Sequence, residues 1–156
     1  MAGYPFMWAM REGGVLAGMP PEYFSEVSDD WYHLSTWCAH ERILRHRTVG
    51  CFVTHNGWNS ACESIAAGVT MVCWPGFADQ YTNIKYAYEV WRVGTRLDDK
   101  VSRDQVCRRV REVMIRVEED GGIRGSANMW KVKAEEAVCA GGTLMGGYFP
   151  GSPMET

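Results

Sequence analysis

The chain has 156 residues, enough for one domain, and its 46% hydrophobic and 22% charged residues are ordinary for a globular protein. Its net charge of −3 gives no basic field that would attract nucleic acid or an anionic membrane, so neither is expected as a partner. The sequence has no apolar run long enough for a membrane span and no secretory signal pattern at its start. We therefore expect a cytoplasmic protein.

Apolar runs alternate with helical patterns along the chain, which predicts βα units and an α/β fold with a Rossmann-like parallel sheet and flanking helices. We predict strands, in chain order, at residues 4–10, 31–37, 49–55, 69–74 and 93–97. We predict helices at residues 41–46, 59–67 and 79–90, and a loop over residues 11–28. Gly68 is expected to end the second of these helices.

Two further helices are predicted in the last third of the chain. Ser102 and Gln105 form a capping-box pattern before an apolar stripe at helical spacing, which consists of Val106, Val110, Val113, Met114 and Val117. After Gly121 and Gly122 a second stripe follows, which consists of Ala127, Trp130, Ala134, Ala137 and Val138. Arginines on the first helix alternate with glutamates, which favours a solvated face over a nucleic-acid-binding one.

The cysteines show no metal-binding pattern. None of the six stands in a C-x-x-C pair, and their wide spacing matches no zinc site; they are Cys38, Cys51, Cys62, Cys73, Cys107 and Cys139. We expect reduced thiols that are mostly buried, with a disulfide scaffold as the alternative.

The centre of the chain has the pattern of a strand, a turn at Asn56–Gly57, and a helix. Ligands of α/β folds bind at such turns, at the carboxyl end of a parallel sheet. The first turn of the helix offers free backbone N–H groups and a partial positive charge, which suit a phosphate group. Gly57 allows close approach of the backbone, Asn59 and Ser60 add side-chain donors, and His55 stands at the tip of the strand. Neither GxGxxG nor a Walker sequence is present.

The segment from Trp37 to Gln80 reads WCAHERILRHRTVGCFVTHNGWNSACESIAAGVTMVCWPGFADQ. Over these 44 positions it resembles the signature of plant family-1 UDP-glycosyltransferases, W-C-P-Q…H…G-x-F-x-T-H-x-G-W-N-S…E…G-V-P…P…D-Q. The flanking YPFMWAMRE and FADQYTNIKYAYEVWRVG resemble the neighbouring segments of that family. The phrase CWPGFADQYTN most resembles the branch that contains cyanohydrin and 7-deoxyloganetin glucosyltransferases.

This resemblance implies a UDP-sugar site. Trp37 would stack on uracil, the Cys38 backbone would hydrogen-bond its edge, and Glu63 would accept hydrogen bonds from the ribose hydroxyls. Ala39 and His40 replace the usual Pro-Gln, and His40 is expected to keep a donor near the nucleoside.

The resemblance also implies which residues contact the diphosphate and the sugar of the donor. His55, Asn59 and Ser60 would hold the diphosphate, and three residues would contact the sugar: Trp58, Asp79 and Gln80. In this family a Gln at the last position goes with glucose, so UDP-glucose is the expected donor substrate. No cofactor and no metal are implied.

Two departures lie outside these assignments. Asn56 replaces a common Cys, which is a mild variation, and Thr70 replaces the Pro of G-V-P, which loosens a turn and adds a hydroxyl.

Each assignment has a structural alternative. Ser60 with Glu63 also matches a capping box, and Asp79 matches a helix N-cap. His55 is equally consistent with a buried, hydrogen-bonded histidine, and the tryptophans Trp37 and Trp58 with core aromatics.

Family members have two facing domains of GT-B type, and the resemblance covers an incomplete C-terminal half that lacks its first strand and helix. We expect this UDP-sugar-binding domain to span residues 1–145, followed by a flexible tail at 146–156. The N-terminal domain of the family carries the catalytic His–Asp pair, and His33, His40 and His46 match no such motif.

The expected reaction is therefore that of the full-length enzyme, transfer of glucose with inversion to a hydroxyl of a small lipophilic plant metabolite. The alternative is a non-catalytic UDP-sugar-binding fragment or a pseudogene remnant.

Overall fold

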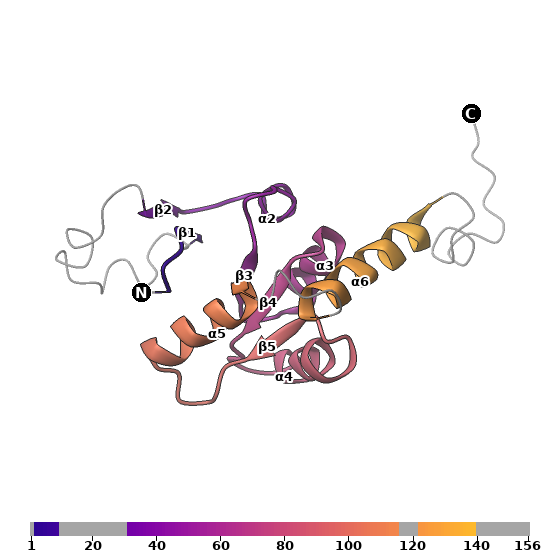
Figure 1. Ribbon diagram of the computed structural model, residues 1–156. Helices are drawn as coiled ribbons and strands as arrows, with labels where there is room; N and C mark the ends of the chain where they lie inside the picture. Colours follow the sequence, from indigo (N-terminus) through magenta and orange to yellow (C-terminus); the bar gives the residue numbers. More distant parts are fainter. Residues whose placement is uncertain (1, 10–30, 116–121, 140–156) are drawn as a thin grey trace.

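The computed structural model describes residues 2–9, 31–115 and 122–139 (Figure 1). The predicted loop at 11–28, the tail at 146–156, and Val117 and Gly121 lie outside the described residues. The strands are β1 (Phe6–Ala9), β2 (Tyr32–Ser35), β3 (Cys51–Thr54), β4 (Thr70–Cys73) and β5 (Gly94–Arg96). The helices are α2 (His40–Leu44), α3 (Trp58–Ala67), α4 (Gln80–Lys85), α5 (Arg103–Ile115) and α6 (Ile123–Val138).

The predicted order of strands and helices is confirmed. Strands β2 to β5 are shorter than predicted at both ends; β1 begins later than predicted, and Met10 lies outside the described residues. The segment 79–90, predicted as one α-helix, contains two types of helix. It begins at Gln80 as α4 and continues after Lys85 as a π-helical turn, η3 (Tyr86–Val90). This wider turn ends with the Trp91 amide donating to the Tyr86 carbonyl at 2.8 Å.

The strands all pair in parallel, as predicted, and they form two separate sheets. The structure has a two-stranded sheet, β1–β2, and a separate three-stranded sheet with the order β3–β4–β5. Figure 1 shows the β1–β2 pair standing apart from the other three strands. Side chains of β1 such as Phe6 and Met7 are exposed, so little apolar burial holds this pair against the rest.

The core of the domain forms on the two faces of β4, whose four residues are all buried. Met71 and Cys73 point to one face and pack with residues of α4, η3 and α6, including Ile84, Ala87 and Ala127. Val72 points to the opposite face and packs with Leu97 and with Val113 of α5. The three-stranded sheet is therefore the middle of an α/β/α sandwich, as the alternation of side chains along a strand requires.

Turn and cap residues support this sheet. Gly68 ends α3 with a φ of 71°, as predicted, and the Ser64 hydroxyl of the same helix donates to the Val69 carbonyl at 2.9 Å. The Thr70 hydroxyl donates to the Gly50 carbonyl at 3.0 Å, so the replacement of Pro by Thr adds a bond between the starts of β3 and β4.

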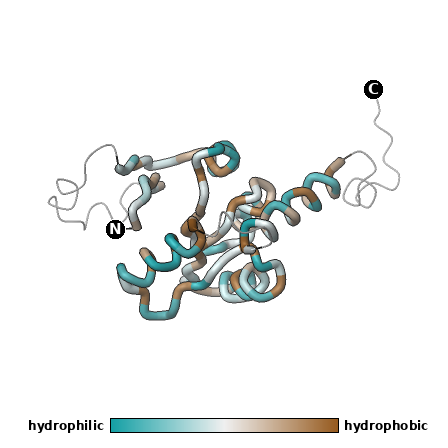
Figure 2. Tube along the Cα trace, viewed as in Figure 1, coloured by the Kyte–Doolittle hydropathy of each residue, from teal (hydrophilic) through white to brown (hydrophobic). Residues whose placement is uncertain are grey.

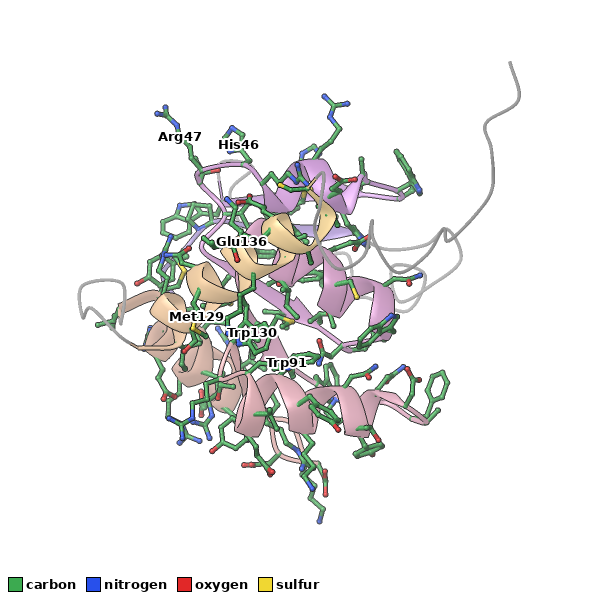
Figure 3. The ribbon with its side chains drawn as sticks, turned by 90° about the vertical axis from the view of Figure 1, so that its right-hand side faces the viewer. His46, Arg47, Trp91, Met129, Trp130 and Glu136 are labelled. Atoms are coloured by element: carbon green, nitrogen blue, oxygen red, sulfur yellow. The ribbon has the colours of Figure 1, made fainter. Side chains whose placement is uncertain are left out.

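The two C-terminal helices are amphipathic, as Figure 2 shows by the mixture of teal and brown along each. The capping residue Ser102 accepts a hydrogen bond from the Gln105 amide at 3.2 Å, which is one of the two bonds of the predicted capping box. The other bond is not made, because Oε1 of Gln105 has no hydrogen-bond partner among the described residues. On α6, the indole of Trp130 donates to the Trp91 carbonyl at 3.2 Å, and the two rings lie side by side with centroids 5.9 Å apart (Figure 3). No helix in the described part of the chain is long and apolar enough to cross a membrane.

The cysteines are free thiols, as expected, but the prediction that most are buried is wrong. Only Cys73 is fully buried; Cys38, Cys51 and Cys107 are half-buried, and Cys62 on α3 and Cys139 after α6 are exposed. Burial raises the pKa of the Cys51 and Cys73 thiols to about 12. These two thiols therefore remain protonated and behave as small apolar side chains.

A substitution at Gly94 tests the tight contact between β4 and β5. A Cβ atom at this position would lie 2.8 Å from the backbone oxygen of Met71. Gly94→Ala should therefore lower the free energy of unfolding by about 1–3 kcal/mol, measured by urea titration with tryptophan fluorescence. The control is Gly125→Ala on α6, where a Cβ meets nothing within 4 Å; it should be neutral or stabilising by about 0.5–1 kcal/mol. Equal effects of the two substitutions would contradict the packing described here.

Candidate functional site

The predicted site residues His55 to Ser60, together with Asp79 and Gln80, follow the carboxyl ends of β3 and β4. The Trp74 amide donates to the Thr54 carbonyl at 2.9 Å, which keeps the two strands paired up to their last residues. The turn after β3 leads into α3, and the loop after β4 leads into α4. Parallel strands thus place both loops at one edge of the sheet, where ligands of α/β folds bind.

The turn after β3 presents the start of α3. The first hydrogen bond of this helix runs from the Ala61 amide to the Gly57 carbonyl, so the amides of residues 58–60 precede the helical ladder. No acidic residue stands in the first turn, and its partial positive charge is therefore not neutralised locally. A Cβ at Gly57 would lie 2.8 Å from Nε2 of His55, so the exposed His55 ring leans over this glycine. The arrangement is suited to a phosphate group.

Asn56, which the sequence presented as a mild variation, shapes the turn after β3. Its φ of 60° is left-handed, a conformation that Asn tolerates better than most residues. Its amide donates to the Thr54 hydroxyl at 3.1 Å, which tightens the turn. Its side chain is 0% exposed, and both polar atoms lack a hydrogen-bond partner among the described residues.

Asn83 links the two loops, and sequence reasoning missed it. Its side-chain amide donates to the Asn56 carbonyl at 3.1 Å and to the Asp79 carboxylate at 3.0 Å. One nitrogen on α4 therefore holds the turn before α3 and the acidic residue before α4 in a fixed relation. Only the spacing of four residues between Asp79 and Asn83 could have indicated this contact, whereas the bond to Asn56 spans 27 residues and follows from the tertiary fold.

Gln80 supports the loop after β4 from inside. Its side chain is 6% exposed, and its Oε1 accepts hydrogen bonds from the amides of Gly76 at 2.8 Å and Phe77 at 3.1 Å. The loop contains Ala78 with a φ of 56°, a conformation that is costly for alanine and needs such support. The oxygen of the Gln80 amide is thus used within the protein.

The third part of the site lies where α2 meets α3. Trp37 follows β2 with 78% of its surface exposed, and its carbonyl accepts a hydrogen bond from the Ser35 hydroxyl at 2.5 Å. His40 opens α2, and its Nδ1 lies 3.4 Å from Oε2 of Glu63 on α3. Desolvation, with a further contribution from the Glu63 charge, raises the pKa of the nearby Cys38 thiol, which therefore stays protonated.

The structure excludes the alternative interpretations of these residues. The N-cap of α3 is Gly57, so Ser60 and Glu63 do not form its capping box, and no side chain caps the helix. Asp79 stands at the N-cap position of α4, but its side chain makes no capping hydrogen bond and instead accepts from Asn83. The side chains of His55, Trp37 and Trp58 are exposed, so none of them is a core residue.

A metal centre has no candidate in the described residues, since no three His, Cys, Asp or Glu side chains are grouped to hold an ion. A helix start at the carboxyl edge of a parallel sheet with helices on both faces defines a Rossmann-like domain, of the kind that forms one half of a GT-B fold. The crystal structure of Os79 from O. sativa in complex with UDP matches this fold with a TM-score of 0.85 and 32% identity; the match covers 93% of this chain and 34% of that one.

A family model described as "UDP-glucoronosyl and UDP-glucosyl transferase" matches residues 2–118, and the chain belongs to this family. It is 39% identical to (R)-mandelonitrile beta-glucosyltransferase of Prunus dulcis over 142 residues, which are 89% of this chain. It is 41% identical to 7-deoxyloganetin glucosyltransferase of Gardenia jasminoides over 140 residues, which are 88% of this chain. The predicted family and branch are thus confirmed. The chain spans 29% of the length of either relative.

Asn83→Ala tests the link between the two loops. The substitution removes both hydrogen bonds and leaves the buried Asn56 carbonyl without this donor, so the free energy of unfolding should fall by about 1–3 kcal/mol in urea titrations. The control is Asn59→Ala, which removes an exposed asparagine from α3 and should change stability by less than about 0.5 kcal/mol. In a double-mutant cycle, Asn83→Ala and Asp79→Ala should couple; additive effects would contradict the bridge.

Proposed function

We propose that this chain is the donor-binding part of a UDP-glucose-dependent glucosyltransferase. The observation that carries the proposal is the unneutralised start of α3, with His55 leaning over Gly57 and Asn83 linking this turn to the Asp79 loop. Support comes from similar solved structures that contain UDP and from similar glucosyltransferases of plants.

In this proposal the diphosphate lies at the first turn of α3. The free amides there and the side chains of Asn59 and Ser60 donate hydrogen bonds to its oxygens, and the ring of His55 contacts it from the side of Gly57. The backbone amides among these donors are fixed by the fold of α3 itself. The negative charge that develops on UDP as the sugar leaves is therefore stabilised without rearrangement.

The nucleoside lies along the junction of α2 and α3. The exposed face of Trp37 offers a stacking surface for uracil, and the backbone of Cys38 offers hydrogen bonds to the edge of the base. Glu63 accepts hydrogen bonds from the ribose hydroxyls. Its Oε2 is buried without a hydrogen-bond partner in the part of the chain that the structure describes, as expected for an acceptor that a ligand completes.

The sugar lies between Trp58 and the loop after β4. Asn83 holds Oδ2 of Asp79, which leaves the other oxygen of this exposed carboxylate for sugar hydroxyls. Gln80 holds its loop through Oε1, so the Nε2 donor is the atom that we assign to glucose.

The acceptor and the base that deprotonates it belong, in this proposal, to the remainder of the full-length enzyme. The histidines other than the assigned His40 and His55 are unsuited to the role of base. His33 lies on β2 apart from the helix start, and His46 is bonded to the Thr48 hydroxyl at 2.8 Å. The acceptor would be a hydroxyl of a small lipophilic metabolite, and the reaction an inverting displacement of UDP.

UDP binding tests the site as a whole. Titration of the chain with UDP should change its tryptophan fluorescence, because Trp37 and Trp58 are exposed beside the assigned site. His55→Ala and Glu63→Ala should each weaken UDP binding about tenfold or more, as loss of a hydrogen bond to a charged group does. Glu89→Ala, an exposed glutamate of η3 outside the site, is the control and should leave affinity unchanged. No binding of UDP by the folded wild-type chain would refute the proposal.

Gln80→Glu tests the sugar contact separately. Glutamate keeps the shape of the side chain and an oxygen that accepts from the Gly76 and Phe77 amides, but it replaces the Nε2 donor. The preference for UDP-glucose over UDP should fall about tenfold by calorimetry. The readout is the ratio of the affinities for UDP-glucose and UDP. Both ligands carry the diphosphate, so its repulsion by the new glutamate charge largely cancels in this ratio. An unchanged ratio would remove Gln80 from the sugar site.

A further inference from the structure

Strand β3 stands at one end of the three-stranded sheet and has an edge that no described strand pairs with. The Trp74 amide donates to the Thr54 carbonyl, so Thr54, and with it Phe52, directs its N–H and C=O groups toward β4. Neighbouring residues of a strand direct these groups to opposite sides, so the backbone groups of Cys51 and Val53 point away from β4. These groups form an edge at which another strand can pair.

The side chains along this edge are only partly covered. Cys51 and Val53 lie on the same face of β3, because side chains alternate along a strand. The Cys51 side chain packs against the core cluster around Val72, whereas Val53 is 48% exposed. Strand β1 pairs with β2 alone among the described strands, and its Phe6 and Met7 are exposed as well. Interior strands of parallel sheets are buried on both faces, so this exposure indicates that β1 and β3 each lack a neighbour.

The order of the strands indicates where such a neighbour belongs. The two sheets have the orders β1–β2 and β3–β4–β5. If one further strand lies between β1 and β3, chain order runs outward from it on both sides, as in the doubly wound fold with strand order 3-2-1-4-5-6. Arg111 on α5 supports this arrangement. Its Nε donates to the Ala2 carbonyl at 2.9 Å, which holds the segment before β1 against a helix that packs on β3 and β4.

We propose that the edges of β1 and β3 together form a docking site for one parallel β-strand, which the remainder of the full-length protein supplies. Insertion of this strand joins the two sheets into one with the order β2–β1–inserted strand–β3–β4–β5. The inserted strand precedes β1 along the chain, as this order requires. The chain spans 29% of the length of the mandelonitrile and deoxyloganetin glucosyltransferases, so the remainder of such a protein is long enough to contain it.

The surroundings of this position define the chemistry of the strand that fits it. Both of its backbone edges are paired, on one side with Cys51 and Val53 and on the other with β1, so proline is excluded from its centre. A strand in this position has sheet neighbours on both sides, as β4 has, and all four residues of β4 are buried. We therefore expect a continuous run of about five Val, Ile or Leu residues. A strand with alternating polar residues would bury polar side chains without partners.

Hydrogen exchange of single amides tests this proposal, because only one side of β3 is paired in the chain alone. The Thr54 amide, which faces β4, should be protected, and the Val53 amide should exchange quickly. The probe is a chimera in which about 40 residues, enough for a strand and its crossover, are fused to the N-terminus of this chain. They are the residues that precede the matching region in the (R)-mandelonitrile beta-glucosyltransferase of Prunus dulcis.

In the chimera the Val53 amide should exchange more slowly relative to the Thr54 amide, by about tenfold or more, because it gains a hydrogen bond to the inserted strand. The ratio of the two rates is measured because a general gain in stability slows both amides and leaves their ratio unchanged. A chimera with the fused residues in scrambled order is the control. It has the same composition and length, and its ratio should equal that of the chain alone.

Val53→Pro tests the edge itself. Proline at this position removes the N–H that points away from β4 and no bond to β4, so the chain alone should still fold. In the chimera this variant should lose most of the increase in urea midpoint that the fused segment gives to the wild-type sequence. An increase of the same size in both would contradict pairing at Val53.

Three results of the exchange experiment would overturn the docking site. The first is an unchanged ratio in the chimera. The second is a protected Val53 amide in the chain alone at every concentration, which would mean that another segment of this chain covers the edge. The third is protection that grows with concentration, which would mean that a second copy covers it. Exchange is measured without UDP, so none of these results bears on the proposed UDP site.

Discussion

Parallel pairing of β3 with β4 brings the carboxyl ends of both strands to one edge of the sheet, and every part of the site depends on this geometry. The pairing persists to the last residues, since the Trp74 amide bonds the Thr54 carbonyl. It is held by the complete burial of β4 between α5 on one face and α4, η3 and α6 on the other. Side chains separated by more than 20 residues, such as those of Asn56 and Asn83, can therefore meet.

The loops at this edge have little regular structure of their own, so polar side chains fix their shape. Asn83 joins the two loops, and Gln80 fixes the backbone of the second loop through its oxygen. Left-handed backbone at Asn56 and Ala78 is tolerated within this network. A site that is arranged before its ligand binds loses less free energy to ordering, which suits stabilisation of a leaving diphosphate.

Much of the fold followed from local patterns. Strands and helices were predicted in the correct order because short apolar runs, periodic stripes and helix-ending glycines such as Gly68 are local signals. The division of the strands into β1–β2 and β3–β4–β5 is visible only in the structure, because strand pairing depends on which surfaces bury each other. The π-helical turn after Lys85 and the exposure of Cys62 were also missed, because both depend on how the helices pack in the tertiary structure.

Membership of the family was determined by the sequence alone, because the block from Trp37 to Gln80 carries the residue types and spacing of the family signature. The sequence also shows which hydrogen-bond donors and acceptors each side chain carries, because these depend on the residue type alone. Only the tertiary structure decided which of those atoms are free. It assigned the oxygen of Gln80 to its own loop, placed His40 against Glu63, and gave Asn83 a role that no local pattern indicated. The physical reason is that a hydrogen bond depends on where two atoms lie in space, and chain spacing specifies this only within a helix, strand or turn.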